Sequence, residues 1–186
     1  ASTYGVIEFC ETACAGPLLS KELDSISRIY SDSKSPIIAI VGGSKISTKL
    51  EVIKSLSKFV DYLILGGGIA NTILKAQGKE IGKSLYEESM LGTAKKMIEK
   101  NSKCQIIEIS DVVVSKEIND SSMSEIKDIN SVANDDLILD IGPKTSDAYE
   151  ETIKKSSTII WNGPVGVFEI DQFSIGTKRI AQAISQ

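Results

Sequence analysis

Histidine is absent from the 186 residues of this chain. Its absence excludes Ser-His and Cys-His nucleophile pairs, and it excludes any metal site built on histidine ligands. Cysteine is scarce, since Cys10, Cys14 and Cys104 form neither a CxxC motif nor an even set. Three thiols without pairing or metal spacing indicate reduced cysteines, and we therefore predict a cytoplasmic protein.

Long apolar runs are also lacking. No stretch approaches the roughly 20 apolar residues of a membrane-spanning helix, and the first residues show no basic and apolar regions of a signal peptide. The net charge of −4 argues against a nucleic-acid-binding surface. We therefore expect neither a membrane nor a nucleic acid among the partners of this chain.

The negative charge is concentrated in one segment. Six acids and two lysines lie between Lys116 and Asp136, while the remaining sequence is close to neutral, so we expect a solvated surface loop there. The hydrophobic content of 41% is ordinary for a chain with one substantial core. Ala1 is not an initiator methionine and the start reads as mid-sequence, so we expect a fragment.

The stretch that organises the chain is Ile37–Leu50, with the sequence IIAIVGGSKISTKL. A β-branched run that ends in two glycines is typical of a buried strand in a parallel sheet. We expect a helix to open at residues 44–49, which would place Lys45 and Lys49 on one face. A strand, a glycine turn, a helix start and two ammonium groups can form a phosphate-binding corner. The alternative is an ordinary turn with solvated lysines.

Strands alternate with helices along the chain, which predicts a three-layer α/β fold: a Rossmann-like, mostly parallel sheet with helices on both faces. The predicted strands span residues 37–41, 62–65, 105–109, 111–115, 137–141 and 158–161. The predicted helices include residues 17–30, 69–76, 87–101, 144–155 and a last one through residues 177–184. The apolar stripe of the first helix (Leu19, Leu23, Ile26 and Tyr30) is expected to pack on the sheet domain.

Four predicted strands run directly into glycine, after Val41, Leu65, Ile141 and Trp161. If these strands are parallel, the four turns meet at the carboxyl edge of the sheet, where open α/β sheets bind ligands. We therefore favour a nucleotide or a similar ligand at this edge over a purely structural explanation. The sequence has no GxxxxGK[ST] loop, and Asn71 replaces the last glycine of a GxGxxG fingerprint.

Five motifs together resemble the phosphoglycerate kinase family. They are GGSKISTKL (42–50), GGGIANTILKAQG (66–78), IGKSL (81–85), LDIGPKT (139–145) and WNGPVGVFE (161–169). They follow the family's order over essentially the whole chain, which would be about half of the enzyme. The resemblance implies a lead-in segment with an interdomain-type helix at residues 1–36. Residues 37–186 would form the nucleotide-binding C-terminal domain, incomplete at its C-terminal end.

The resemblance also implies a reaction, the reversible transfer of a phosphoryl group between 1,3-bisphosphoglycerate and Mg-ADP to give 3-phosphoglycerate and ATP. An acyl phosphate is a good donor, so positioning and charge stabilisation suffice and no histidine is needed. Lys45 matches the family's lysine beside the transferring group, and Lys49 matches the lysine that contacts the nucleotide phosphates. A lysine is a compact, mobile point charge, which suits a group that changes partners.

The resemblance assigns further residues to the nucleotide. Asn162 would lie near the phosphates, and Glu169 would accept hydrogen bonds from the ribose; the alternatives are a turn residue and an ordinary surface glutamate. The other nucleotide-binding residues that it implies, besides the two lysines, are Gly43, Ser44, Gly67, Gly68, Leu139, Gly163, Pro164 and Val167.

The resemblance implies that parts of the active site lie elsewhere. The magnesium ligand is expected beyond Gln186, and the phosphoglycerate would bind through an N-terminal domain, in an enzyme that is a monomer at full length. Ile138 stands where many family members have glycine beside the adenine. We expect this chain to be inactive alone. Two alternatives stay open: an adenine-nucleotide-binding module without chemistry, and a folding fragment without useful affinity.

Overall fold

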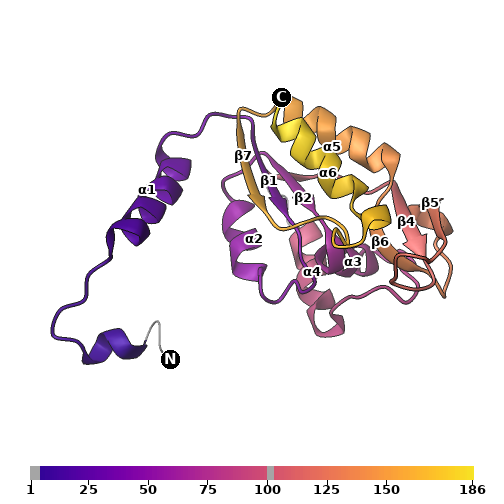
Figure 1. Cartoon of the computed structure of the whole chain (residues 1–186), viewed down its shortest axis with the longest axis horizontal. Coiled ribbons are helices and arrows are strands. Elements are labelled where there is room, and N and C mark those ends of the chain that lie inside the picture. The colour runs from indigo at the N-terminus through magenta and orange to yellow at the C-terminus, as the bar shows by residue number, and fades with distance from the viewer. Residues whose placement is uncertain (1–4, 100–102) are drawn as a thin grey trace. The chain divides into compact units, whose positions relative to one another are not determined.

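The computed structural model of the chain describes residues 5–99 and 103–186. Contacts between residues divide the chain into two compact units, Ala1–Ser33 and Lys34–Gln186. The smaller unit contains a 3-10 helix, η1 (Gly5–Phe9), and the helix α1 (Pro17–Ser31), both drawn in Figure 1. None of the helices in the described ranges is long and apolar enough to cross a membrane.

Helix α1 starts where the sequence predicts a start. Pro17 occupies the first helical position, where its fixed φ suits the helix and its missing N–H has no cost. The apolar stripe of Leu19, Leu23, Ile26 and Tyr30 is about half exposed. The packing of this stripe on the sheet domain stays a prediction.

The larger unit is built on a four-stranded parallel sheet in the order β3-β2-β1-β7. Its strands are β1 (Ile37–Val41), β2 (Tyr62–Leu65), β3 (Gln105–Ile106) and β7 (Thr158–Asn162). Strand β1 is fully buried because both of its faces are covered. It pairs with β2 on one side and β7 on the other, so the ends of all three strands meet at one edge.

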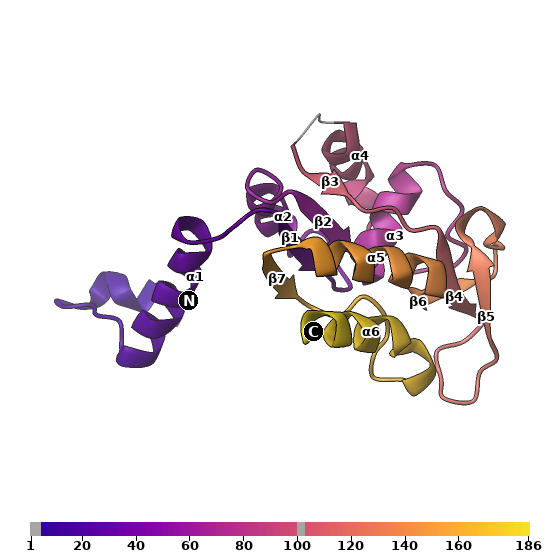
Figure 2. The ribbon, with the colours of Figure 1, turned by 90° about the horizontal axis from the view of Figure 1, so that it is seen from above.

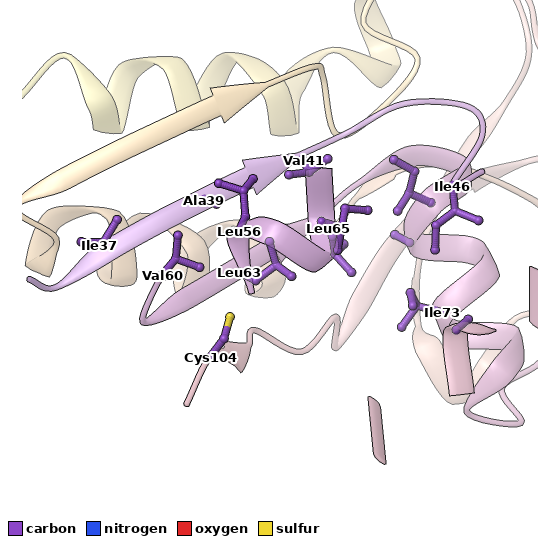
Figure 3. Packing of buried hydrophobic residues seen from close by; sticks show 14 residues of the cluster. Ile37, Ala39, Val41, Ile46, Leu56, Val60, Leu63, Leu65, Ile73 and Cys104 are labelled. Atoms are coloured by element: carbon purple, nitrogen blue, oxygen red, sulfur yellow. The ribbon is translucent and has the colours of Figure 1, made fainter. Parts of the chain in front are cut away.

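Helices cover both faces of this sheet, which confirms the predicted fold class. Side chains of β1 alternate, so Ala39 and Val41 pack in the cluster with α2 and α3, and Ile38 and Ile40 pack in the cluster with α5 and α6. Figure 3 shows the first cluster, and Figures 1 and 2 show α5 and α6 side by side. The helices are α2 (Leu50–Leu56), α3 (Gly67–Ala76), α4 (Leu91–Glu99), α5 (Pro143–Lys155) and α6 (Ile175–Ile184), with the 3-10 turns η2 (Glu88–Met90) and η4 (Asp171–Phe173).

A second sheet, which the sequence does not predict, has three antiparallel strands in the order β5-β4-β6. They are β4 (Asp111–Ser115), β5 (Ser124–Asp128) and β6 (Leu137–Ile141), with the 3-10 turn η3 (Ile129–Ser131) after β5. Residues 137–141 do form the expected strand, but they pair with β4 and not in the parallel sheet. The prediction that this strand belongs to the parallel sheet is therefore wrong.

The acidic segment from Lys116 to Asp136 is more ordered than a solvated loop, because it contains β5 and a buried carboxylate. Asp136 is 1% exposed and accepts hydrogen bonds from Lys116 at 2.7 Å and Lys127 at 2.9 Å. Burial opposes its ionisation, but these hydrogen bonds prevail and lower the pKa of Asp136 to about 2. Part of the negative charge of this segment therefore forms ion pairs with its own two lysines, which stabilise its folded conformation.

Three boundaries differ from the expectation. Helix α2 begins at Leu50, so residues 44–49 form a loop and do not open a helix. The strand expected at residues 105–109 ends at Ile106, after which the chain crosses toward the second sheet. The helix expected at residues 87–101 is a 3-10 turn followed by α4, and residues 100 and 101 lie outside the described residues.

Candidate functional site

A cleft of about 580 Å³ opens between the two sheets of the larger unit. The turns after β1 and β2, the start of α3, strand β6 and the loop after β7 form its walls. Of the site residues expected from the sequence, those that line the cleft are Gly43, Ser44, Gly67, Gly68, Leu139, Pro164, Val167 and Glu169. Segments that are up to about 125 residues apart in the sequence thus line one cavity. The volume of this cavity suits a small ligand.

Three of the four glycine turns pack directly against one another at the end of the parallel sheet. A Cβ on Gly42 would lie 1.7 Å from the carbonyl oxygen of Pro164, and one on Gly66 would lie 2.4 Å from the Cα of Val165. The fourth turn, at Gly142, follows β6 in the other sheet. A Cβ on Gly142 would lie 2.3 Å from the carboxyl carbon of Asp111. The expectation of four turns on one sheet edge is corrected to three.

The start of α3 shows why these turns need glycine. Gly67 has a φ of +62°, which favours glycine, and a Cβ there would lie 2.8 Å from the carbonyl oxygen of Gly43. A Cβ on Gly68 would lie 2.2 Å from the carbonyl oxygen of Ser44. The glycines therefore let the turns of β1 and β2 touch through their backbones, and they leave bare backbone on the cleft wall.

The two lysines lie in the loop between β1 and α2, next to the cleft residue Ser44. Lys45 is exposed, and Lys49 is partly exposed. Among the ion pairs within residues 5–99 and 103–186, none includes Lys45 or Lys49. Their ammonium groups are therefore available to an anion, and an anion at this position would not have to displace a carboxylate.

Lys49 contacts the end of β7. Its Nζ donates a hydrogen bond to Oδ1 of Asn162 at 2.5 Å. Gly163 follows with a φ of +95°, and a Cβ there would lie 2.5 Å from the carbonyl oxygen of Gly42. Lys49, Asn162 and Gly163 thus lie together at the end of the sheet, although none of them lines the cleft itself.

The cleft walls are mainly apolar where β6 faces the loop after β7. Leu139 and Val167 are joined by a backbone hydrogen bond of 2.8 Å from the Val167 N–H to the Leu139 carbonyl. Ile138 also lines the cleft, so a branched side chain occupies the wall at this position. Glu169 is exposed at the rim. An apolar group of a small ligand would fit such walls.

Asp140 also lines the cleft. It lies within β6, is 2% exposed, and accepts hydrogen bonds from the N–H groups of Gly176 (2.7 Å) and Ile141 (2.9 Å). Burial raises the pKa of Asp140 to about 7, since these two hydrogen bonds offset only part of the desolvation. A Cβ on Gly166 would lie 2.3 Å from its Oδ1, so Asp140 packs tightly between the β7 loop and the start of α6.

Sequence reasoning missed several residues of this region. Lys83 and Ile118 line the cleft, although they lie far from the glycine turns in the sequence. Lys83 belongs to the IGKSL motif, which was a signal that the segment matters. Ile118 lies in the acidic segment and had no such signal.

Comparisons with known proteins agree with this geometry. A family model described as Phosphoglycerate kinase matches residues 1–186. The structure of phosphoglycerate kinase from Coxiella burnetii is 45% identical, with a TM-score of 0.87, over 99% of this chain and 48% of that one. The structure of phosphoglycerate kinase from Pyrococcus horikoshii OT3 is 28% identical, with a TM-score of 0.77, over 92% of this chain and 44% of that one. The chain thus spans about half the length of these solved relatives.

Proposed function

The chain belongs to the phosphoglycerate kinase family, and we propose that it supplies the nucleotide-binding part of such a kinase. The proposed reaction is the reversible transfer of a phosphoryl group from the acyl phosphate of 1,3-bisphosphoglycerate to ADP, a step of glycolysis. The attacking oxygen is on the β-phosphate of ADP, the bond that breaks joins phosphorus to the acyl oxygen, and 3-phosphoglycerate leaves as a carboxylate.

The observation that supports this proposal best is the cleft between the sheets. Its apolar walls of Leu139, Pro164 and Val167 suit a purine, and bare glycine backbone at Gly67 and Gly68 leaves room for a flat ring. The lysine loop begins directly beside it. An adenine nucleotide has this division into a flat apolar base and an anionic tail.

Each polar residue then has a proposed role. Lys49, which donates a hydrogen bond to Asn162, would hold the phosphates of the bound nucleotide together with that amide. Lys45 would stabilise the charge on the migrating phosphoryl group. Glu169 at the rim would accept hydrogen bonds from the ribose hydroxyls. Positioning and charge stabilisation account for most of the catalysis in phosphoryl transfer, and lysines can provide both.

Magnesium would arrive with the nucleotide, bound to its phosphates. Within the described ranges the acids form no group of three or more that could hold a metal ion. In the cleft, the carboxyl oxygens of Asp140 already accept hydrogen bonds from two backbone N–H groups, and Glu169 is exposed at the rim. The described acids would therefore leave the metal to the phosphates of the nucleotide. We propose phosphoglycerate as the second substrate, bound outside this chain, and a cytoplasmic location.

Calorimetric titration of the 186-residue chain with ADP tests this function. We expect saturable binding of ADP that Val167→Trp abolishes, because the indole would fill the cleft wall. Val52→Trp is the matched control, since Val52 is 44% exposed on α2 and lies outside the cleft lining. If the unmodified chain bound no ADP, or if both variants bound it equally well, the proposed site would be wrong.

A further inference from the structure

The loop that carries the two lysines has little internal structure to hold it. Between β1 and α2, the side chain of Ile46 is buried in the core, and the backbone N–H of Gly42 at the start of the loop donates to the carbonyl of Asn162 at 2.9 Å. The N–H of Lys49 donates to the carbonyl of Ile46 at 3.0 Å, which closes one tight turn. Lys45 and Ser47 on either side of Ile46 are exposed. At one end of the loop, Lys49 is oriented by its hydrogen bond to Asn162, so the exposed middle of the loop needs a second attachment to fix the direction of Lys45.

Glu87 provides this second attachment. One oxygen of its carboxylate accepts the backbone N–H of Ser47 at 2.7 Å, and the other accepts the hydroxyl of Ser47 at 2.6 Å. Two hydrogen bonds to one residue fix an orientation as well as a position. They also lower the pKa of Glu87, the hydroxyl contributing most, so the carboxylate is ionised at neutral pH.

Glu87 is itself held by the start of α3. Its N–H donates to Oγ1 of Thr72 at 3.1 Å, and that hydroxyl donates to the carbonyl of Gly68 at 2.8 Å. The neighbouring Asn71 donates from Nδ2 to the carbonyl of Leu85 at 3.1 Å. The segment before α4 is therefore fixed to the helix turn whose glycines line the cleft. A continuous set of hydrogen bonds connects Gly68 to the lysine loop through Glu87.

We propose that Glu87 is a positioning residue, which orients the Lys45–Lys49 loop toward the phosphates of a bound nucleotide. This inference rests on the proposed function. Glu87 does not line the cleft, and both of its oxygens are occupied by Ser47, so it acts through the loop and not on the ligand. The charge of Lys45 also helps to lower the pKa of Glu87, but Ser47 is the residue that donates hydrogen bonds to the carboxylate.

The test compares ADP with adenosine as ligands of the 186-residue chain, because only ADP uses the lysines. Glu87→Ala should raise the Kd for ADP about tenfold, since it removes two hydrogen bonds to a charged group. The Kd for adenosine should change less than twofold, because the walls of the cleft are untouched. Glu88→Ala is the matched control: Glu88 is exposed and has no side-chain hydrogen bond within the described residues. It should leave both constants unchanged.

Rescue by a conservative variant separates positioning from charge. Glu87→Gln keeps an oxygen for the Ser47 N–H and an N–H₂ group for the Ser47 hydroxyl, so ADP should bind within about threefold of the unmodified chain. Ser47→Ala, which loses one of the two hydrogen bonds, should lie between Glu87→Ala and the unmodified chain. If Glu87→Gln were as weak as Glu87→Ala, charge and not hydrogen bonding would hold the loop, and the inference would be overturned.

The outcomes also distinguish this inference from the proposed function. If the unmodified chain bound neither ligand, the proposed function would fail and this inference with it. If it bound ADP tightly and Glu87→Ala bound ADP equally well, only the positioning role would fail. If Glu87→Ala lost affinity for ADP and adenosine alike, the residue would support the fold as a whole, which also contradicts the inference. Circular dichroism and thermal unfolding identify that last case.

Discussion

Lys49 and Asn162 meet across 113 residues of sequence, with 2.5 Å between the Nζ of the lysine and Oδ1 of the amide. The contact joins the loop after β1 to the end of β7, two neighbouring strands of the parallel sheet. A neutral amide orients the ammonium group without cancelling its charge. Lys49 is therefore directed by Asn162 and still able to bind a phosphate.

Replacing this amide with a carboxylate should weaken nucleotide binding. In Asn162→Asp the new carboxylate would pair with Lys49 and repel the phosphates, so we expect ADP affinity to fall by about tenfold at low salt, with a smaller loss at high salt. Calorimetry at two salt concentrations measures this. Asn134→Asp adds the same charge at an exposed position outside the cleft and should have no effect. Equal losses for both variants would contradict the proposed contact with phosphates.

The two lysines should differ in what they contribute to turnover. In a complete family enzyme that contains this chain, Lys45→Ala should lower kcat by roughly 10²-fold with little change in ADP affinity, because its charge is used in the transition state. Lys49→Ala should weaken ADP binding as well. Steady-state kinetics and calorimetry on each variant give the two quantities. Similar losses of kcat and affinity in both variants would show that the roles are assigned wrongly.

The chain as given should not turn over by itself. Phosphoryl transfer needs both phosphate groups held in line, and the described residues offer lysines for the nucleotide side only. A coupled assay of the purified 186-residue chain should stay at the level of the blank, with a complete phosphoglycerate kinase as the positive control. Turnover above the blank, proportional to the concentration of the chain, would refute this prediction.

Gly68 should tolerate no side chain. A methyl group there would lie 2.2 Å from the carbonyl oxygen of Ser44, so Gly68→Ala must displace the turn after β1 and should cost about 1–3 kcal/mol of unfolding free energy. Gly92→Ala is the control, because Gly92 lies in α4 with nothing within 4 Å of a new Cβ. It should stabilise the chain by about 0.5–1 kcal/mol. Urea unfolding of both variants measures the difference; a stable Gly68→Ala variant would contradict the observed packing.

Asp140 should make stability depend on pH. Its pKa in the folded chain is about 7, above the ordinary value of 3.8, so the folded state binds more protons than the unfolded state between these two values. Its contribution to the unfolding free energy therefore falls as the pH rises from about 4 to 7, by at most about 1.4 kcal/mol per pH unit, and is constant above that window.

Asp140→Asn removes this titration, because an amide is neutral throughout the range. The difference in unfolding free energy between the variant and the unmodified chain should therefore shift in favour of the variant from pH 4.5 to 7, and then level off. Thermal or urea unfolding at half-unit pH intervals measures it. Asp120→Asn, at an exposed position in the segment between β4 and β5, is the control, because it removes the same side-chain carboxyl group outside the core. A flat difference for Asp140→Asn would contradict the raised pKa of this buried carboxyl group.

Local chemistry alone determined much of this protein. The β-branched run at Ile37–Val41 is a strand buried on both faces, as its composition predicts, and Pro17 begins a helix because its φ suits the first helical position. The glycines that directly follow Val41 and Leu65 mark the turns at which these two strands end. These features depend on neighbours in the sequence, so the sequence by itself is enough to predict them.

Pairing between distant segments was decided only by the tertiary structure. The strand Leu137–Ile141 looks like a parallel strand, yet it pairs with β4, and the polar strand Ser124–Asp128 exists because β4 offers it a partner. Glu87 contacts the lysine loop through hydrogen bonds from Ser47, which lies 40 residues away in the sequence. An apolar run fixes whether a segment is buried, but the choice of partner depends on the competition among all strands and side chains, which no local pattern contains.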